Sequence, residues 1–263
     1  MKRKQIIFMT IVPFMVMIAG CNFNQLNLTQ DKSDENELID ETLSEFERKL
    51  PWDYPVKPGM PEWKLLKYND EMVKACEIPE EILSSLSTED LTELCVEYPL
   101  LINVYAFNFY SYGLDILFKE FNGIRELAKR KDAADCLIER YIQKIQSFPF
   151  LNEEHPDTDK GTLIFSVSDL EFLLSQIAHY NNERSKEILQ CLVYGYEEKL
   201  KYKNYIRLGI RINCFSRVQV ISTIDKTFLE RSPENDLATA LHAGWADDET
   251  FSIINELSYH LIK

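Results

Sequence analysis

Apolar residues recur every three or four positions along most of the chain, which predicts a series of short amphipathic helices. Ser87 looks like the cap of one such helix, and others are expected to open near Asp132 and at Asp248. Asn122-Gly123 is expected to end another. The stripes consist of Leu91, Leu94, Cys95 and Tyr98; Leu114, Leu117, Phe118 and Phe121; Leu137, Tyr141 and Ile145; Leu170, Leu173, Leu174 and Ile177; Leu189, Leu192, Val193 and Tyr196; and Phe251, Ile254, Leu257 and Leu261.

Three segments differ from this simple pattern of amphipathic stripes. Residues 147–166 break the helical pattern and predict a long loop, with helix resuming after Ser168; this loop is the candidate boundary between two subdomains. Residues 206–212 alternate apolar and polar positions, which would suit a strand. Helix is preferred there because a lone strand has no evident partner. Ser232-Pro233-Glu234 has the order of a cap followed by a first helical turn.

The expected fold class is therefore all-α: short antiparallel helices in an irregular bundle or an α-α superhelix-like array. Ahead of them, Ile39, Leu43 and Phe46 predict one more amphipathic helix. A proline-rich strap, residues 51–62 (PWDYPVKPGMPE), follows it and is expected to be extended. Its aromatic residues should pack against the helical body. The alternative is an exposed aromatic surface for glycan or peptide, made of Trp52, Tyr54 and Trp63.

The first twenty residues have a different character. A basic start (KRK, residues 2–4) precedes an apolar run over residues 6–20, and a run near fifteen residues is the length of a signal-peptide core, whereas a spanning helix needs about twenty. The run ends in IAGC (18–21), which resembles the lipobox of bacterial lipoproteins. We expect a signal peptide at 1–20 and lipidation, with acyl chains such as palmitate, at Cys21. The alternative is an ordinary secretory signal in which Cys21 is incidental.

Composition extends this interpretation to the mature chain. Residues 21–36 are polar and predict a tether between the lipid and a helical domain at 37–263. The leader contains three of the 29 basic residues and none of the 43 acidic ones, so its removal leaves a net charge of −17. Such a charge repels phosphate backbones and anionic headgroups, which argues against nucleic acid as a partner. The lipid is then the membrane contact, and the expected location is the cell envelope, with the outer membrane favoured over the inner.

The cysteines and histidines show no ligand spacing. Once Cys21 is assigned to lipid, five cysteines remain, without a CxxC pair, and these are interpreted as buried apolar residues, although one disulfide is compatible with an oxidising envelope. The four histidines are far apart in sequence. No metal site or cofactor is expected. The residues concerned are Cys76, Cys95, Cys136, Cys191 and Cys214, with His155, His179, His242 and His260.

The sequence lacks the residue spacings that common catalytic motifs require. The chain has no GxSxG, HExxH, GxGxxG or GxxxxGK sequence, and its eight glycines are isolated, so no catalytic residue is assigned. The acidic stretch 153–161 resembles a calcium loop only in part, because Gly161 comes one place early and Ser168 stands where a bidentate glutamate is needed. A solvated acidic loop is the preferred interpretation.

Three segments are distinctive: YPVKPGMPEWKLL (54–66), CEIPEEILSSLSTEDLTELCVEYPLL (76–101) and FNGIRELAKRKDAADCL (121–137). They resemble uncharacterised exported helical lipoproteins of Bacteroidota over about the first half of the mature chain. The resemblance implies an envelope location and no activity. Surface-displayed lipoproteins of that phylum often have acidic residues directly after the lipidated cysteine, whereas here the acidic residues begin at Asp31, so display stays open.

Two functions follow as hypotheses. The first is a non-enzymatic binding or scaffold module that offers a groove or face to an envelope protein, peptide or glycan. The second is an envelope hydrolase that cleaves glycan with a carboxylate pair taken from Glu153, Glu154, Asp157 and Asp159. Two carboxylates that converge in a concave, aromatic-lined pocket would favour the hydrolase.

Overall fold

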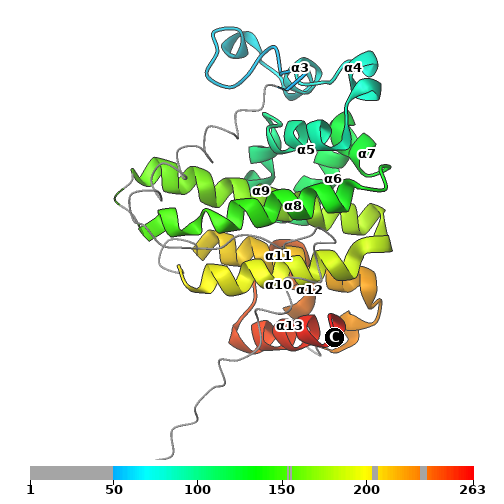
Figure 1. The fold of residues 1–263 in the computed structure, drawn as a ribbon, viewed down its shortest axis with the longest axis vertical. Coiled ribbons are helices and arrows are strands. Elements are labelled where there is room, and N and C mark those ends of the chain that lie inside the picture. The colour runs from blue at the N-terminus through cyan, green and yellow to red at the C-terminus, as the bar shows by residue number, and fades with distance from the viewer. Residues whose placement is uncertain (1–49, 153, 155, 203–206, 232–235) are drawn as a thin grey trace, which may run out of the picture. The chain divides into compact units, whose positions relative to one another are not determined.

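The computed structural model describes residues 50–152, 154, 156–202, 207–231 and 236–263. Residues 50–263 form one compact unit (Figure 1). Its described part contains helices and no strand, so the all-α prediction is confirmed as a packed helical array. The leader, Cys21, the tether, the helix expected before residue 50 and the start expected at Ser232 lie outside the described residues.

The helices follow one another with short connections. Short 3-10 turns separate several of them: η1 (Trp63–Leu65), η2 (Leu101–Ala106), η3 (Phe148–Asn152), η4 (Asn182–Arg184) and η5 (Phe228–Arg231). The α-helices are α3 (Asn69–Ala75), α4 (Glu80–Ser85), α5 (Thr88–Val96), α6 (Tyr110–Glu120), α7 (Asn122–Leu127), α8 (Ala133–Gln146), α9 (Asp157–Tyr180), α10 (Ser185–Leu200), α11 (Arg207–Ile224), α12 (Asp236–Ala243) and α13 (Asp248–Leu261).

Helix α9 is the centre of the array. It packs against α5, α8, α10 and α11, and α8 lies beside it in Figure 1. Because neighbours surround it, nearly every residue from Val167 to Ala178 is buried. By length and composition it is the one helix in the described chain that could cross a membrane, yet 67% of that stretch is buried inside the protein, as expected for a core helix.

The long loop expected at 147–166 is wrong for most of its length. Residues 148–152 form η3, and the helix α9 begins at Asp157, eleven residues before Ser168, after which helix was expected to resume. Pro156 precedes the first turn, and Asp157 and Asp159 place negative charge near the helix N-terminus, which stabilises it. The polar residues that suggested a loop therefore form the solvent-exposed start of a long helix.

Two other segments can be compared with their predicted structure. Residues 207–224 form the helix α11, so the preference for helix over strand is confirmed. The helix α6 ends at Glu120 with Phe121 as its C-cap, directly before Asn122-Gly123 as expected. The same two residues open α7, where the Asn122 side chain accepts a hydrogen bond from the Ile78 N–H and donates one to the Ile78 carbonyl. A β-carbon at Gly123 would lie 2.4 Å from the Phe121 ring, so this glycine permits a close approach rather than a left-handed turn.

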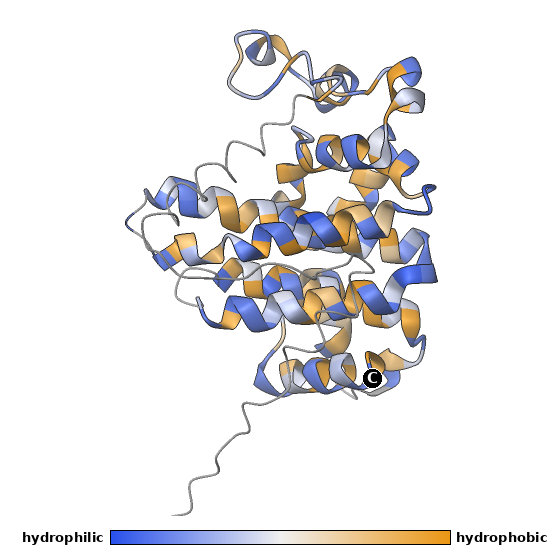
Figure 2. Ribbon diagram, in the orientation of Figure 1, coloured by the Kyte–Doolittle hydropathy of each residue, from blue (hydrophilic) through white to orange (hydrophobic). Residues whose placement is uncertain are grey.

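Helix starts predicted from caps agree well with the structure. Ser87 caps α5 by accepting a hydrogen bond from the backbone N–H of Asp90. Asp247 caps α13 in the same way, so this helix begins at Asp248 as expected. Figure 2 shows hydrophilic and hydrophobic residues alternating along the outer helices, which is the amphipathic pattern that the stripes predicted.

Candidate binding site

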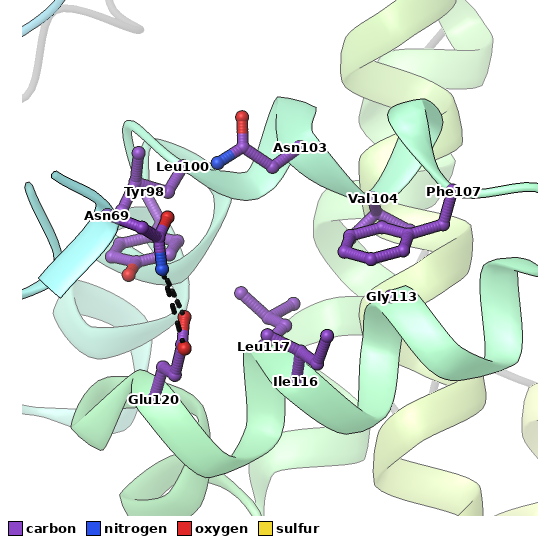
Figure 3. Close-up of a pocket in the computed structure, with 10 residues that line it drawn as sticks. All are labelled: Asn69, Tyr98, Leu100, Asn103, Val104, Phe107, Gly113, Ile116, Leu117 and Glu120. Atoms are coloured by element: carbon purple, nitrogen blue, oxygen red, sulfur yellow. Dashed lines mark hydrogen bonds between the residues drawn. The ribbon is translucent and has the colours of Figure 1, made fainter.

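A cavity of about 180 Å³ opens beside α6, between η2 and the start of α3 (Figure 3). Its walls are mostly hydrocarbon, because α6 and the turn before it direct apolar side chains toward each other. Gly113 makes this approach possible, since a β-carbon there would meet the Phe107 ring at 2.8 Å. The lining residues are Asn69, Tyr98, Leu100, Asn103, Val104, Phe107, Gly113, Ile116, Leu117 and Glu120.

The polar groups of the pocket lie at its rim. Asn69, Asn103 and Glu120 are all exposed to solvent. The Asn69 amide donates to the two carboxylate oxygens of Glu120 at 3.3 and 3.5 Å, which are long hydrogen bonds (Figure 3). The site therefore combines an apolar interior with a rim that contains amides and one carboxylate, which is the usual arrangement of a binding pocket.

An exposed aromatic segment, residues 102–113, continues from the pocket. Ile102, Phe109 and Tyr112 have exposed fractions of 52%, 56% and 58%, which is unusual for three large apolar side chains so close in sequence. The Phe107 ring links the two features, since it lines the pocket and packs edge-on against Tyr112 at 5.5 Å between centroids. Exposed apolar surface next to a pocket is typical of an interaction site.

Trp245 is a further exposed aromatic residue, with an exposed fraction of 60%, and Arg211 packs against its ring. The Arg211 guanidinium lies 3.9 Å from its ring centroid and donates two hydrogen bonds to the Ala243 carbonyl. Gly244 between them has φ +66°, and a β-carbon there would lie 2.8 Å from the Arg211 carbonyl oxygen. The same guanidinium lies 5.1 Å from the centroid of the Tyr110 ring, which connects this residue to the aromatic segment.

Tyr105 fixes the aromatic segment to the central helix. Its hydroxyl donates a 2.8 Å hydrogen bond to Asp169 of α9, and its ring packs against Phe165 and Phe172. Burial raises the pKa of the Asp169 carboxyl to about 7, and the hydrogen bond from Tyr105 opposes this shift. The turn η2, which supplies part of the pocket wall, is thus tied to a carboxyl group whose pKa lies well above that of an exposed aspartate.

This shift predicts a pH dependence of stability. An aspartate in an unfolded chain has a pKa near 3.9, so the folded state binds the Asp169 proton more tightly. The stabilisation is complete below about pH 4 and is lost as the pH rises through about 7, by a total on the order of 4 kcal/mol. Urea unfolding at several pH values should show this loss in the native chain and not in Asp169→Asn. An equal slope in both would contradict the assignment, and Asp157→Asn is the exposed control.

A buried polar cluster lies deeper, where α8, α9, α10 and α11 meet. Glu171 accepts hydrogen bonds from the Tyr141 hydroxyl at 2.5 Å, from Asn213 at 2.7 Å and from the Lys199 ammonium at 2.6 Å. Glu171 and Lys199 are both 0% exposed. Gly195 makes room for this cluster, because a β-carbon there would overlap the Tyr141 hydroxyl. The cluster has no opening to solvent, so we assign it to fold stability rather than to ligand binding.

The residues that the sequence singled out do not gather at the pocket. Tyr54 is 2% exposed and its hydroxyl donates to the Leu94 carbonyl, so it cannot belong to an exposed aromatic surface. Trp52 and Trp63 are partly buried and pack against the same core. Asp157 and Asp159 are exposed in the first turn of α9, and Glu153 lies outside the described residues.

The cysteines and histidines are likewise dispersed. All five cysteines that follow Cys21 are free thiols; Cys136 is half-buried and the other four are buried, where burial raises their thiol pKa values. His179, His242 and His260 lie on three different helices, and His155 is outside the described part. Within that part, no group of three or more histidine, cysteine or acidic residues could hold a metal ion.

Sequence reasoning missed the aromatic segment and Trp245. The signal was present in FNFYSY (107–112), where four aromatic residues fall within six positions and cannot all face one core. The pocket itself had no such signal, because its rim residues come from α3, η2 and α6 and meet only in the folded chain. Comparison with family models, with curated proteins and with solved structures finds no match to this chain.

Proposed function

We propose that this chain is a lipid-anchored binding module of the cell envelope, and that the pocket beside α6 is its binding site. The observation that supports a binding role is the continuity of an apolar pocket with exposed aromatic residues, linked by Phe107. Aromatic side chains are enriched in protein interfaces, and Trp and Tyr are among the residues that contribute most to binding energy there.

The anchoring part of the proposal depends on the sequence. The basic start, the apolar run and IAGC (18–21) together favour export and lipidation at Cys21. The polar residues 22–36 would hold the helical unit away from the membrane surface. An anchored protein with a net charge of −17 meets its partners by diffusion within the envelope and is repelled by phosphate-rich surfaces.

Among the described residues of the acidic stretch, Asp157 and Asp159 do not form a glycan-cleaving pair. Asp157 and Asp159 are two positions apart in a helix and both exposed, so their carboxylates point in different directions. The pocket beside α6 is lined by one carboxylate, that of Glu120, and by no residue of the acidic stretch. Binding is therefore the function that we propose for this chain.

The test is a pull-down of the full-length protein from solubilised envelope, with the pocket blocked in one variant. Ile116→Arg should block it, because an arginine four residues before Glu120 on the same helix face can pair with that carboxylate across the opening. We expect the variant to recover at least tenfold less of the partner than the native chain does, at unchanged thermal stability.

The matched control is Leu200→Glu, which replaces an exposed apolar residue at the end of α10. It should recover as much partner as the native chain. If Ile116→Arg also retains the partner, or if the native chain enriches none in repeated attempts, the pocket is not the binding site and the proposal is wrong.

A further inference from the structure

The size of the pocket limits what can occupy it. A cavity of about 150 Å³ lined by apolar side chains accommodates one benzene ring, and this pocket has about 180 Å³. One aromatic or branched aliphatic side chain therefore fills it, whereas a fatty acyl chain is much too long. The occupant is a single apolar group attached to a larger partner.

The chemistry of the walls narrows the choice further. Apart from the Tyr98 hydroxyl, the interior consists of hydrocarbon from residues such as Leu100, Val104 and Leu117. A sugar ring has hydroxyl groups around most of its edge, and each one buried without a partner costs about 1–3 kcal/mol. An apolar side chain has no such cost and gains about 1.5–3 kcal/mol from full burial. The interior thus favours a peptide side chain over a glycan.

The rim of the pocket contains a negative charge and an amide that could bind a peptide backbone. Glu120 is exposed, and among the described residues no lysine or arginine forms an ion pair with it; its partner is the neutral Asn69 amide. A cationic group of the partner, next to the apolar side chain that fills the pocket, would form an ion pair with Glu120. Asn103 offers an amide that can both donate to and accept from the backbone of an extended peptide.

We propose that the pocket binds one aromatic or branched aliphatic side chain of a peptide or protein partner, and that an adjacent lysine or arginine of the partner pairs with Glu120. This inference rests on the proposed binding function and names its ligand class. The acidic balance of the whole chain, with 43 acidic and 29 basic residues, favours the approach of such a partner.

The test uses blocked tripeptides as probes and the methyl NMR signals of Leu100, Val104 and Leu117 as the readout. Acetyl-Gly-Phe-Lys-amide is expected to shift these signals and to bind at least tenfold more tightly than acetyl-Gly-Ala-Lys-amide, since the ring is buried. It should bind about threefold to tenfold more tightly than acetyl-Gly-Phe-Glu-amide. Glu120 attracts the lysine of the first peptide and repels the glutamate of the second, and the difference is small because the rim is exposed to solvent.

Two variants separate the contribution of the ion pair with Glu120 from that of the buried apolar side chain. Glu120→Gln keeps the shape of the rim and should abolish the preference for lysine over glutamate, while the preference for phenylalanine over alanine persists. Ile116→Arg should remove binding of all three peptides. N-acetylglucosamine and a short-chain phosphatidylcholine are the competing probes, and a pocket-specific shift with either one and none with the peptides overturns the inference.

Failure of this inference can be told from failure of the proposed function. If the pull-down is pocket-dependent but the tripeptides show no preference for phenylalanine or lysine, the ligand class is wrong and the binding function stands. If the pull-down is insensitive to Ile116→Arg, the proposed function itself fails, whatever the tripeptides do.

Discussion

Replacing Glu171 by alanine is expected to lower the free energy of unfolding by about 3–5 kcal/mol, the cost of removing one partner from a buried ion pair. The substitution leaves the Lys199 ammonium in the core with the Gly209 carbonyl as its remaining partner. It also deprives the Tyr141 hydroxyl and the Asn213 amide of the carboxylate oxygen to which both donate. Because domains are typically stable by about 5–15 kcal/mol, this one change removes a large part of the total.

Urea unfolding of a double-mutant cycle measures the effect. Glu171→Met combined with Lys199→Met should cost less than the sum of the single changes, because the double variant leaves no uncompensated charge in the core. Burial lowers the pKa of Lys199, so an isolated ammonium there can relieve part of the cost by losing its proton. The coupling free energy between Glu171 and Lys199 should therefore be favourable. It should be smaller than for a pair in which the remaining lysine could not lose its proton.

The chain contains a matched control on the same helix as Lys199. Lys201 and Glu198 also form an ion pair, at 2.7 Å, but their side chains are 60% and 24% exposed. Glu198→Ala should change the unfolding free energy by less than about 0.5 kcal/mol. If Glu171→Ala and Glu198→Ala have similar small effects, Glu171 is not buried as the structure shows.

The amphipathic stripes predicted most helices because a stripe identifies the buried face of a helix that is covered on one side. Helix α13 is an example, with Ile254 and Leu257 buried and its acidic first turn exposed. The same logic fails for α9, which has neighbours on several sides. Glu171, Ser175 and Gln176 lie between its apolar positions, and a helix covered on one side would expose them, yet all three are buried. No periodicity distinguishes a helix covered on all sides from one covered on one side when polar residues remain in it.

The candidate site was less predictable than the fold for a related reason. Stripes and caps are local in sequence, whereas the pocket joins Asn69 to Glu120 and the exposed Trp245 depends on Arg211. The aromatic residues of the strap, in contrast, were conspicuous in the sequence. Tyr54 is a core residue, and burial is possible because its hydroxyl donates a hydrogen bond to the Leu94 carbonyl. Aromatic content alone therefore indicates neither a surface nor a core, and the partner of the polar end decides.

Replacing Cys21 by alanine is expected to abolish incorporation of an alkyne-tagged fatty acid into this protein, and this is the second large effect that we predict. The lipid would be attached through the thiol of Cys21, and alanine has no group that could replace it. Each buried methylene contributes about 0.8 kcal/mol, so a lipoprotein with several acyl chains stays in the membrane, whereas the variant should be recovered in soluble fractions.

Cys136→Ala is the control, because Cys136 is a half-buried free thiol and its removal should leave the label unchanged. Labelling and fractionation together separate the alternatives. A native chain without label that is exported in soluble form would indicate an ordinary secretory signal. Equal labelling of the native chain and Cys21→Ala would mean that the lipid is attached elsewhere. In that case residues 22–36 would no longer be a tether between a lipid and the helical unit, and the pocket beside α6 would have to be considered without an anchor at Cys21.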